Sequence, residues 1–267
     1  MRVAHINSIG TPCPPPNYGG TERCIAQMVA FQAAICAYDV SLYASSDSYI
    51  LAYTAEVARQ LGLKVAIDSG DQAVCVTTSD GKIGRVKLRT TGHPAPGYRH
   101  ASCNQLNQML VGLLLTDDQR RAFDLIHCHH RRFTISALIP AGLAPKTLTH
   151  THSPTLEGDY GQYRYPLICI SNSQAELLHE NHGANVFEVI YHGLDRYTYT
   201  ATLASAGYLA WLGHFAWKKG PDAAIKIAKK VGRPLILAGM RREKDEVTQR
   251  YAEDEVESRI DAYDTSF

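Results

Sequence analysis

Apolar and polar positions along this chain follow the two-residue alternation of strands in some segments and helical spacing in others. Residues 2–8 (RVAHINS) have the alternation of a short strand, and residues 21–37 carry apolar side chains at helical spacing. A second strand-like run follows at 39–45 (DVSLYAS). This order predicts a strand–helix–strand unit at the start of the chain.

Strand and helix patterns continue to alternate to about residue 190. Either Ser171 or Ser173 is expected to cap the last helix of this region, at 174–181. The region 63–90 is less regular, with short strand-like runs and an Asp-Gly turn signal at 80–81. The predicted helices cover 54–62, 102–122, 132–142 and 174–181, and the predicted strands cover 123–129, 146–152 and 166–173.

A second strand–helix–strand unit follows a boundary region near 190–206. It consists of a strand in GYLAWLG, a helix in GPDAAIKIAKKVG with Pro221 in its first turn, and a strand in PLILAG; a polar helical pattern begins after residue 239. We therefore predict domains at 1–192 and 193–267. The alternation predicts an α/β fold with a Rossmann-like parallel sheet, and such sheets bind ligands at the carboxyl ends of their strands.

Composition narrows the functional classes. With 45% apolar residues, 20% charged residues and a net charge of +1, the chain has the balance of an ordinary soluble protein, and no nucleic-acid partner is indicated. No run reaches the roughly 18 apolar residues of a membrane span. Seven scattered cysteines without a CxxC pair favour a reducing, cytoplasmic location. The basic segment from Lys82 to Arg89 is a candidate for peripheral contact with lipid head groups.

The stretch PNYGGTE follows the first strand and leads into the first helix. Gly19 and Gly20 let the backbone approach a ligand without an intervening Cβ, and the helix that begins near Thr21 and Glu22 offers positive potential to a phosphate. A tight turn that only caps this helix explains the same residues about equally well.

Histidines gather at the ends of two predicted strands: His127, His129 and His130 after one, and His150 and His152 after the other. Residues two apart in a strand face the same way, so these side chains could line one wall of a site. They could hydrogen-bond a substrate, bind zinc as in a metal hydrolase, or be core histidines. We predict no metal, because carboxylate or cysteine ligands have no recognisable spacing beside them.

The turn LGHFAWKKGPD places Lys218 and Lys219 just before a predicted helix N-terminus, where a phosphate would gain from the helix dipole. A solvated basic turn is the alternative. In order and spacing, the stretches RVAHINS, PPPNYGGTERCIAQMV, FDLIHCHH, LTHTHSP, LICISNSQAELL, VIYHGLD and YLAWLGHFAWKKGPD resemble a family 4 retaining glycosyltransferase of the GT-B type.

The resemblance covers about 1–50 and 120–240 and implies two facing Rossmann-like domains, the second of them incomplete in this chain. It implies a nucleotide-sugar donor, a sugar or lipid-linked acceptor, and no cofactor. Gly19 and Gly20 would face the donor diphosphate, with Thr21 and Glu22 opening the helix behind them. The donor motif falls on Gly213, His214, Lys219 and Gly220, and the active-site histidine motif falls on His152, with His150 beside it and His129 lining the same site.

Two departures from the family pattern leave a second interpretation open. His214 stands where the family has an arginine, and the later segment that carries the family's E-F-G...E nucleotide-sugar motif is not present. A sugar- or partner-binding remnant without catalysis is therefore the alternative to a glycosyltransferase. In either case we expect a further chain segment or a second subunit to cover the open edge of the second sheet.

Overall fold

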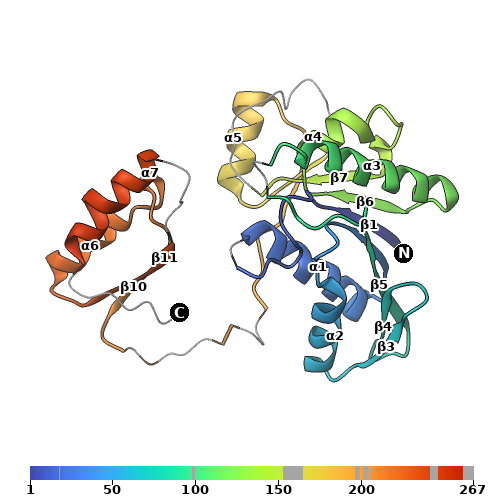
Figure 1. The fold of residues 1–267 in the computed structure, drawn as a ribbon, viewed down its shortest axis with the longest axis horizontal. Coiled ribbons are helices and arrows are strands. Elements are labelled where there is room, and N and C mark those ends of the chain that lie inside the picture. The colour runs from blue at the N-terminus through green and yellow to red at the C-terminus, as the bar shows by residue number, and fades with distance from the viewer. Residues whose placement is uncertain are drawn as a thin grey trace. The chain divides into compact units, whose positions relative to one another are not determined.

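The computed structural model describes residues 1–17, 19–97, 100–152, 165–195, 199, 200, 204, 206–240 and 246–260, without the side chains of Arg132 and Met240. The chain divides into two units, Met1–Tyr199 and Thr200–Phe267 (Figure 1). The domain boundary that the sequence analysis puts between 192 and 193 stays a prediction. No helix in the described ranges is long and apolar enough to cross a bilayer.

A mostly parallel sheet of nine strands forms the first unit, in the order β3-β4-β5-β2-β1-β6-β7-β8-β9. The strands from β5 to β9 in this order pair in parallel, and β3, β4 and β5 form an antiparallel ribbon at one edge. The α/β fold class expected from the sequence is thereby confirmed. The strands are β1 Arg2–Ile6, β2 Asp39–Tyr43, β3 Lys64–Asp68, β4 Ala73–Thr77, β5 Ile83–Arg89, β6 Leu125–Cys128, β7 Thr147–His150, β8 Leu167–Cys169 and β9 Val186–Val189.

Helices cover both faces of this sheet (Figure 1). On one face, α1 (Gly20–Cys36) packs Ile25 and Val29 with strand residues that include Val40 and Leu42. On the other face, α3 (Cys103–Arg120) packs Leu110 and Leu114 with Ala4, Ile6 and Ile126. Alternate strand residues therefore enter two different cores, as a three-layer α/β arrangement requires. The remaining helices of this unit are α2 Ile50–Gln60, α4 Arg131–Phe133, continued by a π-helical turn at Thr134–Leu138, a 3₁₀ turn at Ala144–Lys146 and α5 Asn172–His182.

Two of the predicted helices differ from the structure at their ends. The helix expected over 54–62 begins earlier, at Ile50, because this fully buried side chain belongs to the core beneath α1. The pattern at 132–142 gives only a short helix and one wide turn, and it ends before Pro140, which has no amide hydrogen to donate. The predicted cap of α5 is confirmed at Ser171, whose Oγ accepts a hydrogen bond from the Gln174 amide at 3.1 Å.

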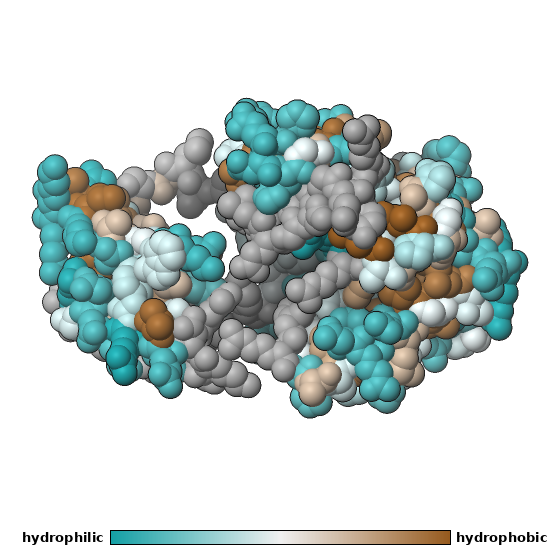
Figure 2. Space-filling model, turned by 90° about the horizontal axis from the view of Figure 1, so that it is seen from above, coloured by the Kyte–Doolittle hydropathy of each residue, from teal (hydrophilic) through white to brown (hydrophobic). Residues whose placement is uncertain are grey.

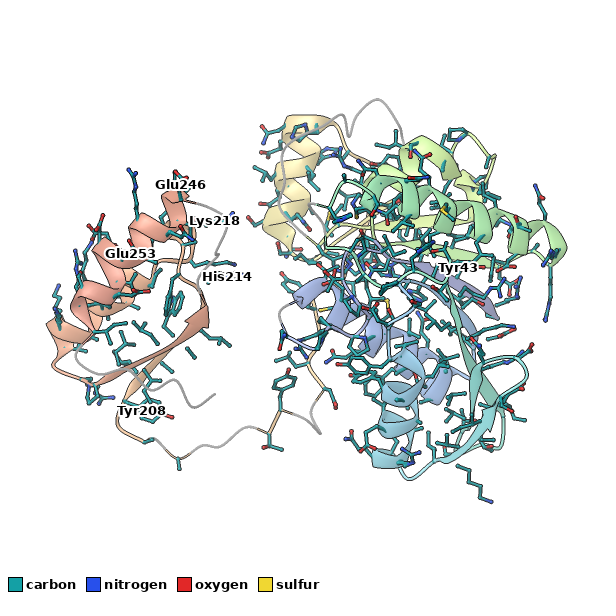
Figure 3. The ribbon with its side chains drawn as sticks, in the orientation of Figure 1. Tyr43, Tyr208, His214, Lys218, Glu246 and Glu253 are labelled. Carbon is teal, nitrogen blue, oxygen red and sulfur yellow. The ribbon has the colours of Figure 1, made fainter. Side chains whose placement is uncertain are left out.

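A buried carboxylate ties α3 to the ends of two strands. Asp117 accepts hydrogen bonds from the Tyr43 hydroxyl at 2.7 Å and from Nε and Nη2 of Arg89 at 2.6 and 2.7 Å (Tyr43 is labelled in Figure 3). A two-pronged guanidinium–carboxylate pair with a third donor leaves little of this carboxylate unsatisfied. It therefore fixes α3 against β2 and β5.

The basic segment Lys82–Arg89 is ion-paired within the chain. Lys82 contacts Asp80 at 2.7 Å, Arg85 contacts Asp68 and Asp71, Lys87 contacts Asp71 at 3.2 Å, and Arg89 contacts Asp117. Its positive charge is thus largely compensated locally. Contact with lipid head groups stays a prediction.

The second unit is built on two parallel strands and one amphipathic helix. β10 (Leu209–His214) pairs with β11 (Leu235–Met240) in a register that sets Gly213 beside Gly239. A 3₁₀ turn at Trp217–Lys219 leads into α6 (Pro221–Val231), which has proline at its first position as predicted. Beyond them lie α7 (Glu246–Tyr251) and short turns at Ala252–Val256 and Glu257–Arg259; residues 241–245 and 261–267 of the predicted polar helix lie outside the described residues.

Apolar side chains remain exposed on this second unit. Leu212 is 85% exposed and Ile236 is 50% exposed, on the two paired strands, and Ile227 of α6 is also exposed. Apolar patches interrupt an otherwise mostly polar surface (Figure 2). The expectation that a further segment or subunit covers part of this surface stays a prediction.

We predict that Gly84→Ala destabilises the first unit. Gly84 of β5 lies so close to α1 that a Cβ would overlap the backbone carbonyl of Ala33, and backbone atoms cannot rotate away. Overpacking of this kind reduces the free energy of unfolding by about 1–3 kcal/mol or more. The measurement is urea denaturation of the full chain.

Gly112→Ala is the matched control. Gly112 lies in α3, where a Cβ would meet nothing within 4 Å, so alanine should raise stability by roughly 0.5–1 kcal/mol. Equal effects of the two substitutions would contradict the close packing of α1 on β5.

Candidate functional site

Five histidines lie on one face of three neighbouring strands. The parallel register of β1 and β6 sets His5 beside His127, and His129 follows two residues later, just after β6. The register of β6 and β7 brings His150, the last residue of β7, to the same level, with His152 beyond it. Residues two apart share a face. The structure thus brings together His129, His150 and His152, as the sequence analysis expected.

The rings of these histidines stack on one another. The ring centroids of His127 and His129 are 4.4 Å apart, and those of His150 and His152 are 4.2 Å apart. Between the two pairs, the rings of His127 and His150 lie 5.4 Å apart and within 7° of parallel. We call this group, His5, His127, His129, His150 and His152, the histidine row. His130 is not in it and stacks on Phe133 instead.

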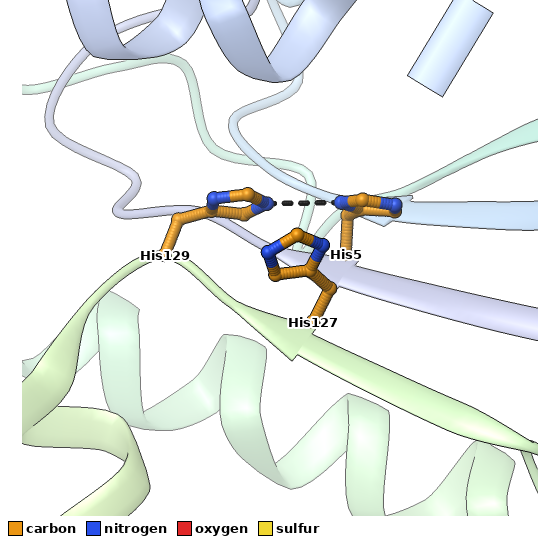
Figure 4. A group of neighbouring side chains, drawn as sticks. All are labelled: His5, His127 and His129. Atoms are coloured by element: carbon orange, nitrogen blue, oxygen red, sulfur yellow. Dashed lines mark hydrogen bonds between the residues drawn. The ribbon is translucent and has the colours of Figure 1, made fainter. Parts of the chain in front are cut away.

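A chain of hydrogen bonds runs along one side of the row. Oε1 of Gln32, on α1, lies 2.8 Å from Nε2 of His5. Nδ1 of His5 lies 2.9 Å from Nε2 of His129, the hydrogen bond that is dashed in Figure 4. Nδ1 of His129 lies 2.9 Å from Nε2 of His152, and Nδ1 of His152 lies 3.0 Å from Nε2 of His192. These hydrogen bonds therefore connect the C-terminal part of α1 to the segment that follows β9.

Gln32 sets the direction of these hydrogen bonds. An amide oxygen only accepts, so the hydrogen of a neutral His5 ring lies on Nε2, and its Nδ1 accepts. His129 then donates from Nε2 and accepts at Nδ1, and His152 repeats the pattern. In this series of hydrogen bonds, the tautomer of each ring is fixed by the neighbour that lies nearer to α1.

Burial keeps the row uncharged at neutral pH. Desolvation lowers the pKa of His5 to about 4 and that of His150 to about 4, and it holds the pKa values of His127 and His129 well below the ordinary value. Desolvation, aided by the neighbouring His150 and His192, lowers the pKa of His152 to about 2. Neutral imidazoles can donate and accept hydrogen bonds and can bind metal ions, but they carry no positive charge to a phosphate.

Three buried ring nitrogens of the row have no hydrogen-bond partner among the described residues. They are Nε2 of His127 and both ring nitrogens of His150. His127 is 5% exposed and His150 is 3% exposed. Buried polar atoms of this kind are uncommon and call for an explanation.

The glycine loop before α1 has a conformation that only glycine fits. Gly19 has φ 157°, and a Cβ there would lie 2.7 Å from Cγ of Pro15 and 2.8 Å from Oε2 of Glu22. Gly20 is the first residue of α1 and has open space around it, while Thr21 is half-buried. Glu22 is only 2% exposed, and its carboxylate lies at the helix start, where the dipole favours negative charge.

The second group of predicted site residues lies in the turn between β10 and α6. His214 ends β10 and is buried, and Lys219 is exposed in the short 3₁₀ turn that follows (Figure 3 labels His214 and Lys218 of this stretch). The Lys219 carbonyl accepts a hydrogen bond from the Trp211 indole at 3.0 Å, which anchors the turn to β10. Gly220 has φ 64° and directly precedes α6.

Sequence reasoning missed three members of the site: His5, Gln32 and His192. His5 sits inside an ordinary strand, Gln32 was one of many helical positions, and His192 lies in a segment without a clear pattern. No local signal distinguishes them, because they join the row only through strand register and the packing of α1.

We predict that acid destabilises the metal-free first unit through the row. The folded-state pKa values of His5 and His150 lie below the unfolded value of 6.5, so the unfolded chain takes up protons first as the pH falls. Stability is therefore full above about pH 6.5 and is lost progressively towards pH 4. One pKa unit corresponds to about 1.4 kcal/mol, so the loss should reach several kcal/mol by urea denaturation in buffer with a chelator.

His150→Asn should reduce this pH dependence, whereas His93→Asn, at an exposed position, should leave it unchanged. A free energy of unfolding that stays level between pH 6.5 and 4 would refute the assignment of buried neutral rings.

Comparisons with known proteins support the fold. No protein-family profile and no curated protein matches the chain. Among solved structures, a glycosyltransferase from Rickettsia africae ESF-5 matches with a TM-score of 0.50 and 11% identity, over 94% of this chain and 64% of that one. The apo form of the lipopolysaccharide outer core galactosyltransferase WaaB matches with a TM-score of 0.46 and 11% identity, over 95% and 64%. This chain thus spans 64% of the length of each neighbour, and its α/β fold is one that glycosyltransferases have.

Proposed function

We propose that the protein is a glycosyltransferase that moves a sugar from a nucleotide-sugar donor to a sugar or lipid-linked acceptor with retention of configuration. The observation that carries the proposal is the turn between β10 and α6. There an exposed lysine directly precedes a glycine in the left-handed conformation and then a helix N-terminus. This arrangement suits the diphosphate of a nucleotide sugar.

Lys219 and α6 would stabilise the departing diphosphate. The lysine supplies a full positive charge, and the aligned peptide dipoles of an eleven-residue helix add a partial one at its N-terminus. Gly220, at φ 64°, lets the chain turn sharply into the helix, so that the lysine and the helix start stay close together. Electrostatic stabilisation of charge that develops on the leaving group is commonly the largest catalytic contribution.

The row would serve the transferred sugar, and the glycine loop would serve a phosphate of the donor. His152 lies at the carboxyl edge of the sheet, where it is hydrogen-bonded to His129 through Nε2 and to His192 through Nδ1 and is stacked on His150. A hydroxyl of the transferred sugar would take the place of the exposed His192 ring at Nδ1. Gly19 and Gly20 present bare backbone at the start of α1, and Thr21 and Glu22 continue the helix behind them. None of these groups acts as a strong base, which agrees with a retaining transfer driven by departure of the diphosphate.

A binding module without catalysis is the second candidate function. It is favoured by His214, which is 8% exposed at the end of β10 where the resemblance predicts an arginine. An imidazole lacks the permanent charge and the two-pronged geometry of guanidinium towards phosphate. Such a module would bind a sugar or a partner without turnover.

We predict that Lys219→Ala lowers donor turnover by about two to three orders of magnitude, the usual effect of removing one group that stabilises developing negative charge. The assay follows release of UDP, GDP or ADP from a panel of the corresponding sugar nucleotides, with simple glycosides and a lipid extract as acceptors. The fall should appear in kcat, because the lysine acts on the leaving group.

Lys229→Ala is the matched control, since Lys229 is an exposed lysine in the last turn of the same helix. It should leave turnover unchanged. Donor binding by the wild-type chain without any turnover would favour the binding module, and turnover that survives Lys219→Ala would refute the role of this lysine.

A further inference from the structure

The inner end of the histidine row has the donor set of a transition-metal site. His5, His127 and His129 each offer a ring nitrogen, and these three atoms all lie within 4.8 Å of one another (Figure 4). Their side chains are 0%, 5% and 7% exposed. Three imidazole nitrogens from two adjacent strands thus converge on one buried point.

We propose that His5, His127 and His129 bind one divalent transition-metal ion of the zinc class, although the sequence alone predicted no metal. The site goes beyond the proposed function, in which His152 contacts the transferred sugar and His129 acts only through its hydrogen bond to His152. Imidazole suits zinc, cobalt, nickel and copper, whereas magnesium and calcium need oxygen ligands, which the three residues do not offer.

The unpartnered nitrogen of His127 is the first independent support. Nε2 of His127 is buried and has no hydrogen-bond partner among the described residues. A buried imidazole nitrogen without a partner loses its hydration and gains nothing in return. An ion bound to this atom removes the penalty.

The outer partners of the other two ligands are the second support. Histidines that bind metals usually donate their remaining N–H to a fixed acceptor, which orients the ring. Here Nε2 of His5 donates to Oε1 of Gln32 at 2.8 Å, and Nδ1 of His129 lies 2.9 Å from Nε2 of His152, which can act as the acceptor only after the hydrogens between these rings shift. Nδ1 of His5 and Nε2 of His129 are then the atoms that face the ion, and their present separation of 2.9 Å needs to open only to about 3.3 Å for tetrahedral zinc.

Each of the three rings must offer the ion a nitrogen that carries no hydrogen. An ion at Nε2 of His129 would release the hydrogen of that atom to solvent. Nδ1 of His129 would then take the hydrogen of His152 Nε2, Nδ1 of His152 would take that of His192 Nε2, and the exposed His192 ring would regain one from water at Nδ1.

A second trio, His129, His150 and His152, competes for the same ion. Its three ligand atoms also lie within 4.8 Å of one another, and both ring nitrogens of His150 lack partners in the described part of the chain. His129 belongs to both trios, so a single ion chooses between them. We assign the inner trio because Gln32 orients His5, whereas the outer trio would take His152 away from the sugar.

The test measures metal binding directly and needs no substrate, so it fails or succeeds separately from the proposed function. The full chain is stripped with 1,10-phenanthroline, titrated with Zn²⁺ at pH 7.5, desalted and analysed for zinc. We expect one zinc per chain. Co²⁺ in its place should give the visible absorption bands of a four-coordinate site with nitrogen ligands.

Variants locate the ion. His127→Asn and His5→Gln should each weaken zinc binding at least 100-fold, and Gln32→Leu, which keeps all three ligands, should weaken it by about 10- to 100-fold. His150→Asn and the exposed His93→Asn should keep one zinc. Circular dichroism checks that each variant is folded. If a variant that lacks a ligand does not fold, Gln32→Leu, which keeps all three ligands, still tests the proposal.

Three results would overturn the proposal. The first is a wild-type chain that retains no stoichiometric zinc after desalting. The second is a folded His127→Asn or Gln32→Leu variant that binds zinc as tightly as the wild type. Loss of the ion in His150→Asn, with binding kept in His127→Asn, would move the site to the outer trio.

Discussion

The register of β1, β6 and β7 is the constraint on which the rest of the first unit depends. Ile126 and Cys128 of β6 are fully buried in the core beneath α3, and His127 lies between them on the opposite face. A shift of one residue would exchange these faces and would put imidazoles into an aliphatic core. Burial of the aliphatic side chains therefore also decides where the histidines gather, next to α1.

The close approach of α1 gives the buried histidines a hydrogen-bond partner. The helix turns alanines towards the sheet, among them Ala26, Ala30 and Ala33, and Gly84 of β5 leaves room for its backbone. Small residues on both sides let α1 approach the sheet, and Gln32 of this helix accepts a hydrogen bond from His5 at 2.8 Å. The polar row is thus anchored at one end by a neutral amide, and its rings remain uncharged because burial disfavours imidazolium.

The two groups of predicted site residues have different electrostatic character. The row in the first unit is neutral and rich in donors and acceptors, which suits hydroxyl groups or a metal ion. The turn before α6 in the second unit carries Lys219 and a helix dipole, which suits a diphosphate. A nucleotide sugar contains both kinds of chemistry, and the turn before α6 is the observation on which the proposal of glycosyl transfer rests.

Most of the fold could be predicted from periodicity, because helices and strands that must bury one face show it in their spacing. The βαβ opening, the Ser171 cap, Pro221 at the start of α6 and the α/β class all follow from local patterns. The start of α2 at Ile50 and the wide turn after Phe133 could not be predicted, because burial of Ile50 and the site of helix termination depend on neighbours distant in the chain.

The sequence by itself determined that histidines two apart would share a face and that glycines would precede two helices, since strand alternation and backbone freedom are local properties. Only the tertiary structure decided that His5 joins His127 and His129, that Gln32 orients them, and that the rings stay neutral. Those features arise from register between strands more than 100 residues apart and from burial under α1, and neither is encoded in any short stretch of the chain.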